Sequence, residues 1–190
     1  NDLGEVPRKP ENAFCLQGGG LSIHGGTVNI IDCAICSNTA DSHGGGIYIE
    51  GSSSSTMVTI TSANISLSSA DEWGGGVYSK GTGSVVIFTN CEISGNTAAY
   101  GGGVFITGGT ATFESCQIYG NTADASVGGG VFITYYAIVN FTSCEISGNT
   151  AKWGGGVYGN GGQASFVTCS ISGNTATQAA DAGGGVAIFG

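Results

Sequence analysis

The sequence predicts an all-β fold, a right-handed parallel β-helix (solenoid) of about six coils with 26–30 residues in each coil. The first observation is a Gly-Gly-Gly triplet that recurs along the chain, beginning at Gly18, Gly44, Gly74, Gly101, Gly128, Gly154 and Gly183. The second is a block between the triplets, Cys-Glu-Ile-Ser-Gly-Asn-Thr-Ala at 91–98, which returns with changes at 33–40, 63–70, 116–123, 144–151 and 169–176. A repeat of this length is typical of solenoid architectures.

When the copies are aligned, like residues fall into columns. An aliphatic column follows the triplet and consists of Leu21, Ile47, Val77, Val104, Val131, Val157 and Val186. A bulky apolar column consists of Ile30, Ile60, Phe88, Phe113, Phe141 and Phe166, and an isoleucine column of Ile35, Ile65, Ile93, Ile118, Ile146 and Ile171. Short alternating segments separated by Gly, Ser and Asn predict three short strands in each coil. Neighbouring strands lie about 4.8 Å apart, so each side chain is expected to pack on its own copy in the next coil.

Two further columns fit the corners of the coils. The polar column Asn38, Ser68, Asn96, Asn121, Asn149 and Asn174 predicts an interior ladder in which each amide bonds to the next and satisfies turn backbone. The glycine triplets fit a corner that needs an unusual φ angle or a close approach of two backbones.

The combined pattern Phe-x-x-Cys-x-Ile-Ser-Gly-Asn-Thr-Ala followed by Gly-Gly-Gly-Val and Tyr or Phe resembles the polymorphic outer-membrane-protein repeat, within the pectate-lyase-like β-helix superfamily. That repeat pairs Phe-x-x-Asn with Gly-Gly-Ala and an aliphatic residue, whereas here Cys replaces the Asn and Gly replaces the Ala. The resemblance covers the expected β-helix repeat domain, residues 18–190, and implies a secreted or surface-displayed passenger domain used in adhesion. Residues 1–17, with both prolines, are expected to form an N-terminal cap or arm.

The amino-acid composition limits the classes of molecule that the chain is expected to bind. Acidic residues number 13 against 4 Lys and Arg, and charged residues make up only 9% of the chain. So few cations argue against nucleic acid as a partner and against binding to an anionic membrane surface. No apolar run approaches the ~18 residues of a membrane span, so membrane insertion is not expected.

The residues that carry enzyme chemistry are scattered. Glycoside hydrolysis needs two carboxyl groups about 5–10 Å apart, but Glu92, Gln117 and Glu145 share one column whose middle member is an amide. The only arginine is Arg8, outside the repeats, and His24 and His43 occupy different parts of their coils. We therefore expect no catalytic residues, no metal site and no cofactor.

The cysteine column consists of Cys33, Cys91, Cys116, Cys144 and Cys169, with Ala63 in one coil. Each residue of this column precedes an inward isoleucine by two positions, and residues two apart in a strand point to the same side. The cysteines are therefore expected to point inwards. Two interpretations stay open: small buried hydrophobes, or disulfides between neighbouring coils such as Cys91 with Cys116 or Cys144 with Cys169.

The candidate binding residues follow the triplets. In Val-Tyr-Ile and Val-Phe-Ile the flanking residues point inwards and the middle residue outwards. This predicts an outward aromatic ladder of Tyr48, Tyr78, Phe105, Phe132 and Tyr158. Trp73, Tyr100 and Trp153 precede the triplets and are expected to flank the same face. The ladder is either an exposed interaction site or an in-sheet aromatic stack covered by the variable loops.

Asn64 and Asn140 begin the sequons Asn-Ile-Ser and Asn-Phe-Thr, both beside inward columns. They are predicted N-glycosylation sites in a protein that follows a eukaryotic secretory route.

The function expected first is a non-enzymatic, extracellular or cell-surface structural and adhesive module, such as a fibre or passenger-domain piece. The alternative is a binding face for glycan or for ice, with an outward threonine column of Thr39, Thr97, Thr122, Thr150 and Thr175. The sequence stops in the first strand of a new coil, at 183–190. This suggests a piece of a longer solenoid, or head-to-tail self-association into a filament, or, as a third reading, a capped monomer.

Overall fold

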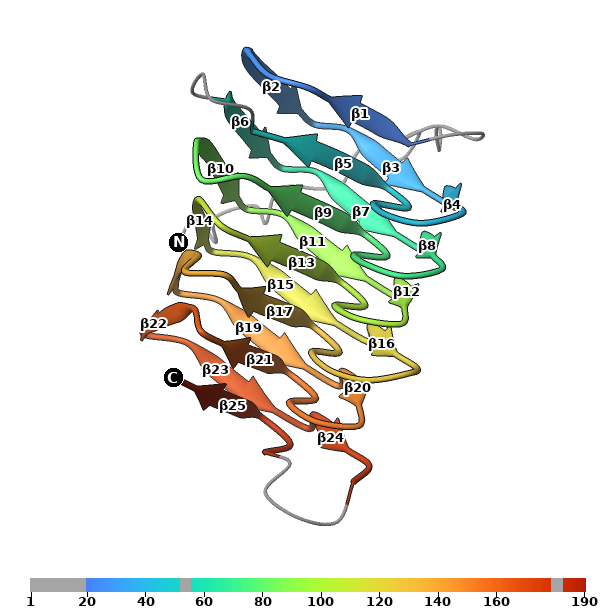
Figure 1. Cartoon of the computed structure of the whole chain (residues 1–190), viewed down its shortest axis with the longest axis vertical. Coiled ribbons are helices and arrows are strands. Elements are labelled where there is room, and N and C mark those ends of the chain that lie inside the picture. The colour runs from blue at the N-terminus through green and yellow to red at the C-terminus, as the bar shows by residue number, and fades with distance from the viewer. Residues whose placement is uncertain (1–19, 52–55, 179–182) are drawn as a thin grey trace, which may run out of the picture.

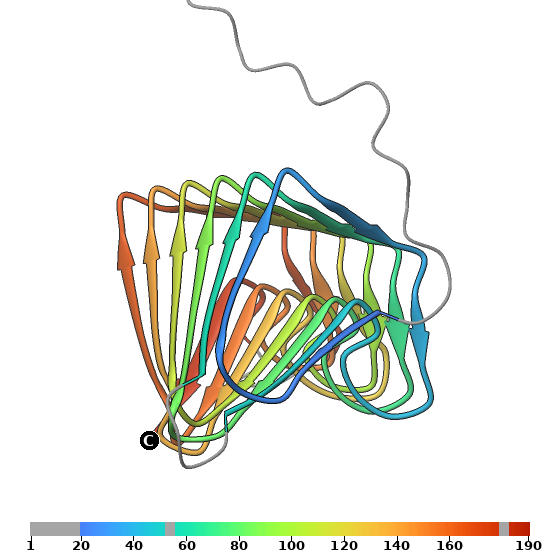
Figure 2. The same ribbon diagram turned by 90° about the horizontal axis from the view of Figure 1, so that it is seen from above.

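A computed structural model of the chain describes residues 20–51, 56–178 and 183–190. The expected N-terminal cap, residues 1–17, lies outside the described residues. In the described part the chain winds into successive coils, and each coil adds one short strand to each of four sheets (Figures 1 and 2).

The sheets are named here A to D in the order in which the chain visits them. Sheet A contains β1 (Leu21–Ile23), β5 (Ile47–Glu50), β9 (Val77–Lys80), β13 (Val104–Thr107), β17 (Val131–Thr134), β21 (Val157–Asn160) and β25 (Val186–Phe189). Sheet B contains β2 (Thr27–Ile31), β6 (Thr56–Thr61), β10 (Ser84–Thr89), β14 (Thr110–Glu114), β18 (Ile138–Thr142) and β22 (Gln163–Val167). Sheet C contains β3 (Ala34–Cys36), β7 (Asn64–Ser66), β11 (Glu92–Ser94), β15 (Gln117–Tyr119), β19 (Glu145–Ser147) and β23 (Ser170–Ser172). Sheet D contains β4 (Thr39–Ala40), β8 (Ser69–Ala70), β12 (Thr97–Ala98), β16 (Thr122–Ala123), β20 (Thr150–Ala151) and β24 (Thr175–Ala176).

The predicted parallel solenoid and its register are confirmed. Neighbouring strands pair in parallel, and residues of one column face each other, as Phe88 faces Phe113 and Ile118 faces Ile146. The expectation of three strands per coil is wrong by one, because the Thr-Ala pairs form the two-residue strands of sheet D. A strand of two residues is too short to show the alternation of apolar and polar residues by which a strand is recognised in a sequence.

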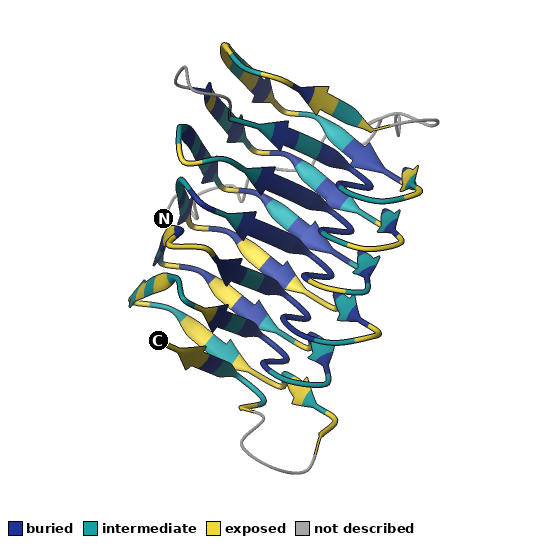
Figure 3. Ribbon diagram, viewed as in Figure 1, coloured by how far each residue is buried: buried dark blue, intermediate teal, exposed yellow. Residues whose placement is uncertain are grey.

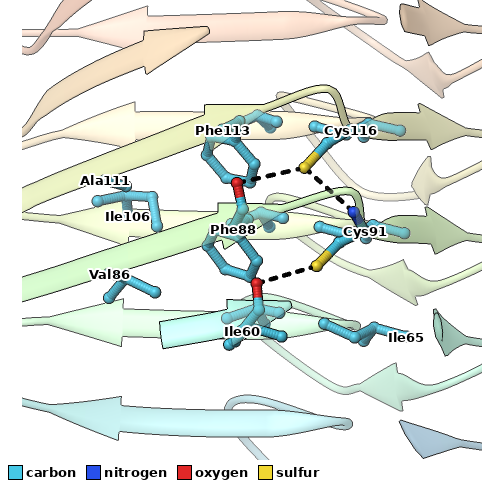
Figure 4. Close-up of a cluster of buried hydrophobic side chains, with 14 of the residues drawn as sticks. Ile60, Ile65, Val86, Phe88, Cys91, Ile106, Ala111, Phe113 and Cys116 are labelled. Carbon is cyan, nitrogen blue, oxygen red and sulfur yellow. Dashed lines mark hydrogen bonds between the residues drawn. The ribbon is translucent and has the colours of Figure 1, made fainter. Parts of the chain in front are cut away.

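The predicted inward columns form one continuous core (Figure 3). The rings of Phe88 and Phe113 stack with centroids 4.5 Å apart and planes 1° from parallel (Figure 4). Phe141 continues the stack, with its ring centroid 5.0 Å from that of Phe113. Ile65, Ile93, Ile118 and Ile146 are fully buried beside them. The same contact therefore recurs from coil to coil, and this is why the sequence repeats the same residue.

Polar groups inside the coils are joined by the predicted asparagine ladder. The Nδ2 group of Asn121 donates to Oδ1 of Asn149 at 3.0 Å and to the carbonyl of Ile93 at 2.9 Å. The Oδ1 atom of Asn121 accepts from the backbone N–H and from Nδ2 of Asn96, both at 3.0 Å. Each amide thus ties together three successive coils.

The ladder has one fault. Ser68 stands where the neighbouring coils have Asn, and its hydroxyl accepts only the backbone N–H of Asn38, at 3.3 Å. Among the described residues, Nδ2 and Oδ1 of Asn38 are buried and have no hydrogen-bond partner. Such orphaned amide atoms are costly in a protein interior.

The glycine triplets allow the backbone to pass close to the asparagine ladder and to sheet D. A Cβ atom added to Gly75 would lie 2.3 Å from the carbonyl oxygen of Thr97, and one added to Gly76 would lie 2.9 Å from Nδ2 of Asn96. No side chain fits at either distance, so the close approach predicted from the triplets is confirmed.

The cysteine column points inwards, and its described members Cys33, Cys91, Cys116, Cys144 and Cys169 are free thiols. The disulfide interpretation of this column is therefore wrong. The thiol of Cys116 donates to the carbonyl of Phe88, and that of Cys91 to the carbonyl of Ile60 at 3.2 Å (Figure 4). The neighbouring thiols of Cys144 and Cys91, together with burial, raise the pKa of Cys116 and favour its protonated form. Cys36, outside the column, is disulfide-bonded.

We predict that Ile118→Ala destabilises the protein by about 2–5 kcal/mol, because it opens a cavity in the central coil. The matched change Glu145→Gln, at an exposed position of sheet C, should cost less than about 0.5 kcal/mol. Urea unfolding of the two variants measures both costs. Equal costs would contradict the assignment of inner and outer columns.

Candidate binding site: an aromatic groove on sheet A

The aromatic ladder lies on the outer face of sheet A. Val104 and Ile106 point into the core from β13, so Phe105 between them points away from it. Register places the ladder residues side by side, as Phe105 faces Tyr78 on one side and Phe132 on the other. The predicted outward orientation is confirmed.

Trp73 and Tyr100, which precede two of the triplets, lie against the rings of this face. Gly74 adopts φ +67, and a Cβ atom there would lie 2.3 Å from the carbonyl oxygen of Val77, so the chain reverses sharply at this point. The turn lays the Trp73 ring against Tyr78 at 5.9 Å and against Phe105 at 5.7 Å between centroids. Tyr100 approaches Phe132 in the same way, at 6.4 Å. The expectation that Trp73 and Tyr100 flank the ladder is confirmed, and Trp153 lines a hollow together with the ladder residues Phe132 and Tyr158.

Trp73 and Tyr100 cover the central residues of the ladder and shield them from solvent. Tyr78 is only 3% exposed and Phe105 only 5%, whereas Tyr48, Phe132 and Tyr158 are half-buried. Burial raises the pKa of Tyr78 to about 12. The interpretation of the ladder as a continuous exposed surface is therefore wrong, because its central rings are the floor of a covered aromatic layer.

Two hollows remain open along this layer. The first, of about 490 Å³, is lined by Glu72, Trp73, Tyr100, Phe105, Phe132, Thr134 and Tyr135. The second, of about 370 Å³, is lined by Tyr100, Ser126, Val127, Phe132, Trp153, Tyr158, Asn160 and Phe189. Val127 occupies the pre-triplet position at which neighbouring coils have Tyr100 and Trp153, and its smaller side chain leaves the space of the second hollow. Because both hollows share Tyr100 and Phe132, we name the pair the aromatic groove.

Tyr135 and Tyr136 contribute to this face in a way that the repeat columns did not reveal. They form the turn between β17 and β18, with φ +51 and +59, where the preceding coil has Gly108 and Gly109 at +74 and +72. Tyr135 is 72% exposed and Tyr136 is 87% exposed. Large side chains in a left-handed turn are strained, and such strain often marks a functional position. The signal in the sequence was Tyr-Tyr in place of Gly-Gly.

Charged side chains meet the ladder at β5 and β9. Nζ of Lys80 lies 2.8 Å from Oε1 of Glu50 and 5.6 Å from the centre of the Tyr48 ring. The hydroxyl of Tyr48 donates to Oε2 of Glu50 at 3.2 Å, and Nδ1 of His24 lies 3.1 Å from the same oxygen. The hydrogen bond from Lys80 is the largest of the influences that lower the pKa of Glu50, so this carboxylate stays charged.

The other predicted site residues lie elsewhere. Asn64 lies in β7 and Asn140 in β18, both half-buried between inward residues, and Oδ1 of Asn64 is buried without a partner. Their glycosylation stays a prediction. Within residues 20–51, 56–178 and 183–190, no group of three or more His, Cys, Asp or Glu is placed to hold a metal ion. In the same part of the chain, no helix is long and apolar enough to cross a membrane.

Stacked parallel strands, repeated ring columns and an interior amide ladder define the class of this protein as a β-helix. The sequence model of the family described as "right handed beta helix region" matches residues 19–190, and the chain belongs to that family. No curated protein matches the chain significantly, and neither does any solved structure.

We predict that Phe105→Ser destabilises the protein by about 3–5 kcal/mol, the cost of truncating a buried ring. Tyr158→Ser, at the half-buried end of the ladder, should cost roughly half as much or less. Chemical unfolding compares the two. A near-zero cost for Phe105→Ser would show that the aromatic layer is not packed in solution.

Proposed function

We propose that this protein is a non-enzymatic, extracellular adhesive β-helix that contacts its partner through the aromatic groove. The observation that carries the proposal is the pair of aromatic hollows on one face of a regular solenoid. Pockets that combine aromatic walls with a few polar groups are the usual form of a binding site. The in-register coils hold the walls in place, so little ordering is needed when a partner binds.

The chemistry of the groove supports binding rather than turnover. The first hollow contains one carboxylate, Glu72, and the second contains none. Glycoside hydrolysis needs a pair of carboxyl groups, and neither hollow supplies the pair. The net negative charge of the chain, formally −9, favours uncharged or cationic partners over anionic ones.

Glycan binding is a second candidate function for the neutral hollow between Tyr100 and Trp153. Its lining combines the rings of Trp153 and Tyr158 with the side chains of Asn160 and Ser126. Rings can stack on the C–H faces of sugars, while amide and hydroxyl groups bond to sugar hydroxyls. An ice-binding face has less support, because sheet D carries one rank of threonines and Ser69 interrupts it.

The experiment is to probe one array of glycans and one of immobilised extracellular proteins with the full chain and with Trp153→Ser. The proposal predicts retained binding to at least one array member by the full chain, and at least about a tenfold loss for Trp153→Ser, since aromatic anchors dominate interfaces. Glu145→Gln, on sheet C, serves as the control and should bind like the wild type.

Two results would contradict the proposal. One is the absence of binding to both arrays. The other is chemical conversion of a bound array member, detected by mass spectrometry, which would make the protein an enzyme.

A further inference from the structure

The first hollow has the walls of an aromatic cage. Trp73 and Phe105 stack with centroids 5.7 Å apart and planes 25° apart, and Tyr100 and Phe132 stack at 6.4 Å and 28°. The two pairs meet where Phe105 and Phe132 lie 4.7 Å apart with their planes at 82°. The lining rings of the hollow thus include two stacked pairs set at a steep angle to each other, with Phe105 almost fully buried at the floor, and Tyr135 is part of the lining.

The charge around this hollow is negative. Glu72 lines the hollow, and its side chain is more than half exposed. No Lys or Arg is among the lining residues, and the whole chain carries a formal charge of −9. Nδ1 of His43 lies 3.8 Å from Oε2 of Glu72 and approaches the carboxylate from the preceding coil. The faces of aromatic rings and a carboxylate both attract positive charge, so a hollow that combines them favours a cation as its ligand.

A contact of this kind already joins β5 and β9. The ammonium group of Lys80 lies over the Tyr48 ring and against the Glu50 carboxylate. In register with Lys80, the following coils have Thr107, Thr134 and Asn160. The first hollow thus has rings and a carboxylate but no lysine of its own to supply the positive charge.

We propose that the first hollow binds the head group of an organic cation, a quaternary ammonium such as that of choline. The methyl groups of such a cation contact ring faces, while its charge is attracted by the rings and by Glu72. A volume of about 490 Å³ is within the range of small-molecule sites. The compact ammonium of a free lysine is more strongly hydrated, and it loses more on entering an apolar corner.

The Tyr135–Tyr136 turn gives this assignment a second, independent support. Both residues keep a strained left-handed conformation where the preceding coil has glycines. Of the two, Tyr135 lines the hollow. In this assignment the strained turn has a function, which is to place the Tyr135 ring at the open side of the cage.

The first test is calorimetric titration of the full chain with choline and with its uncharged carbon isostere, 3,3-dimethylbutan-1-ol, at equal ionic strength. Choline should bind measurably and the isostere at least about tenfold more weakly. Glu72→Gln should weaken choline binding roughly threefold to tenfold. Glu114→Gln, at an exposed position on sheet B, is the matched control and should leave it unchanged.

The second test separates binding from strain. Tyr135→Gly and Tyr136→Gly remove similar side chains and relieve the same turn, so both should leave the melting temperature unchanged or raise it. Only Tyr135→Gly should lose choline affinity. Equal binding of choline and its isostere, absence of choline binding, or equal effects of the two glycine variants would overturn the assignment. Array binding by the chain can persist in each of these cases, so the adhesive function is tested separately.

Discussion

The hydrogen bonds of the asparagine ladder are the interaction on which the rest of the structure depends. Asn121 and Asn149 each accept two hydrogen bonds through Oδ1 and donate two through Nδ2. A slip of one residue would leave these groups unpaired and turn every inward side chain outwards. The ladder therefore supports the register that the phenylalanine and isoleucine stacks need. It also explains the glycines, since only backbone fits between the amides and the next turn.

Register inside the solenoid determines what is presented outside it. Because every coil repeats, a single outward position becomes a ladder of rings 4.7–5.5 Å apart. The candidate site arises where the repeat is broken. Val127 opens one hollow by being small, and Tyr135 lines the other from a strained turn. Residues that follow the repeat thus stabilise the fold, and residues that depart from it shape the candidate binding site.

This division also explains what could be predicted from the sequence. The Ile, Phe and Asn columns were predictable because stacking on identical neighbours forces the same residue to recur. Whether Tyr78 and Phe105 are covered stayed open, because the cover depends on the reversal at Gly74, which a residue column does not show. The strands of sheet D are too short for a periodic pattern. Tyr135 and Tyr136 fall between the columns, and only comparison with the glycines of the neighbouring coil reveals them.

Repair of the ladder at Ser68 tests the account most directly. Ser68→Asn should give the buried amide of Asn38 a partner and raise the free energy of unfolding by about 1 kcal/mol, the usual net worth of a hydrogen bond. Asn121→Ser, the reverse change two coils away, should lower it by at least about 2 kcal/mol, because it removes the acceptor of Nδ2 of Asn96, the side-chain donor to the carbonyl of Ile93 and one of the two donors to Oδ1 of Asn149. Urea unfolding of both variants gives these values. If Ser68→Asn destabilised the protein as much as Asn121→Ser, the size of the side chain would determine this column, and the ladder would not be the interaction that holds the coils in register.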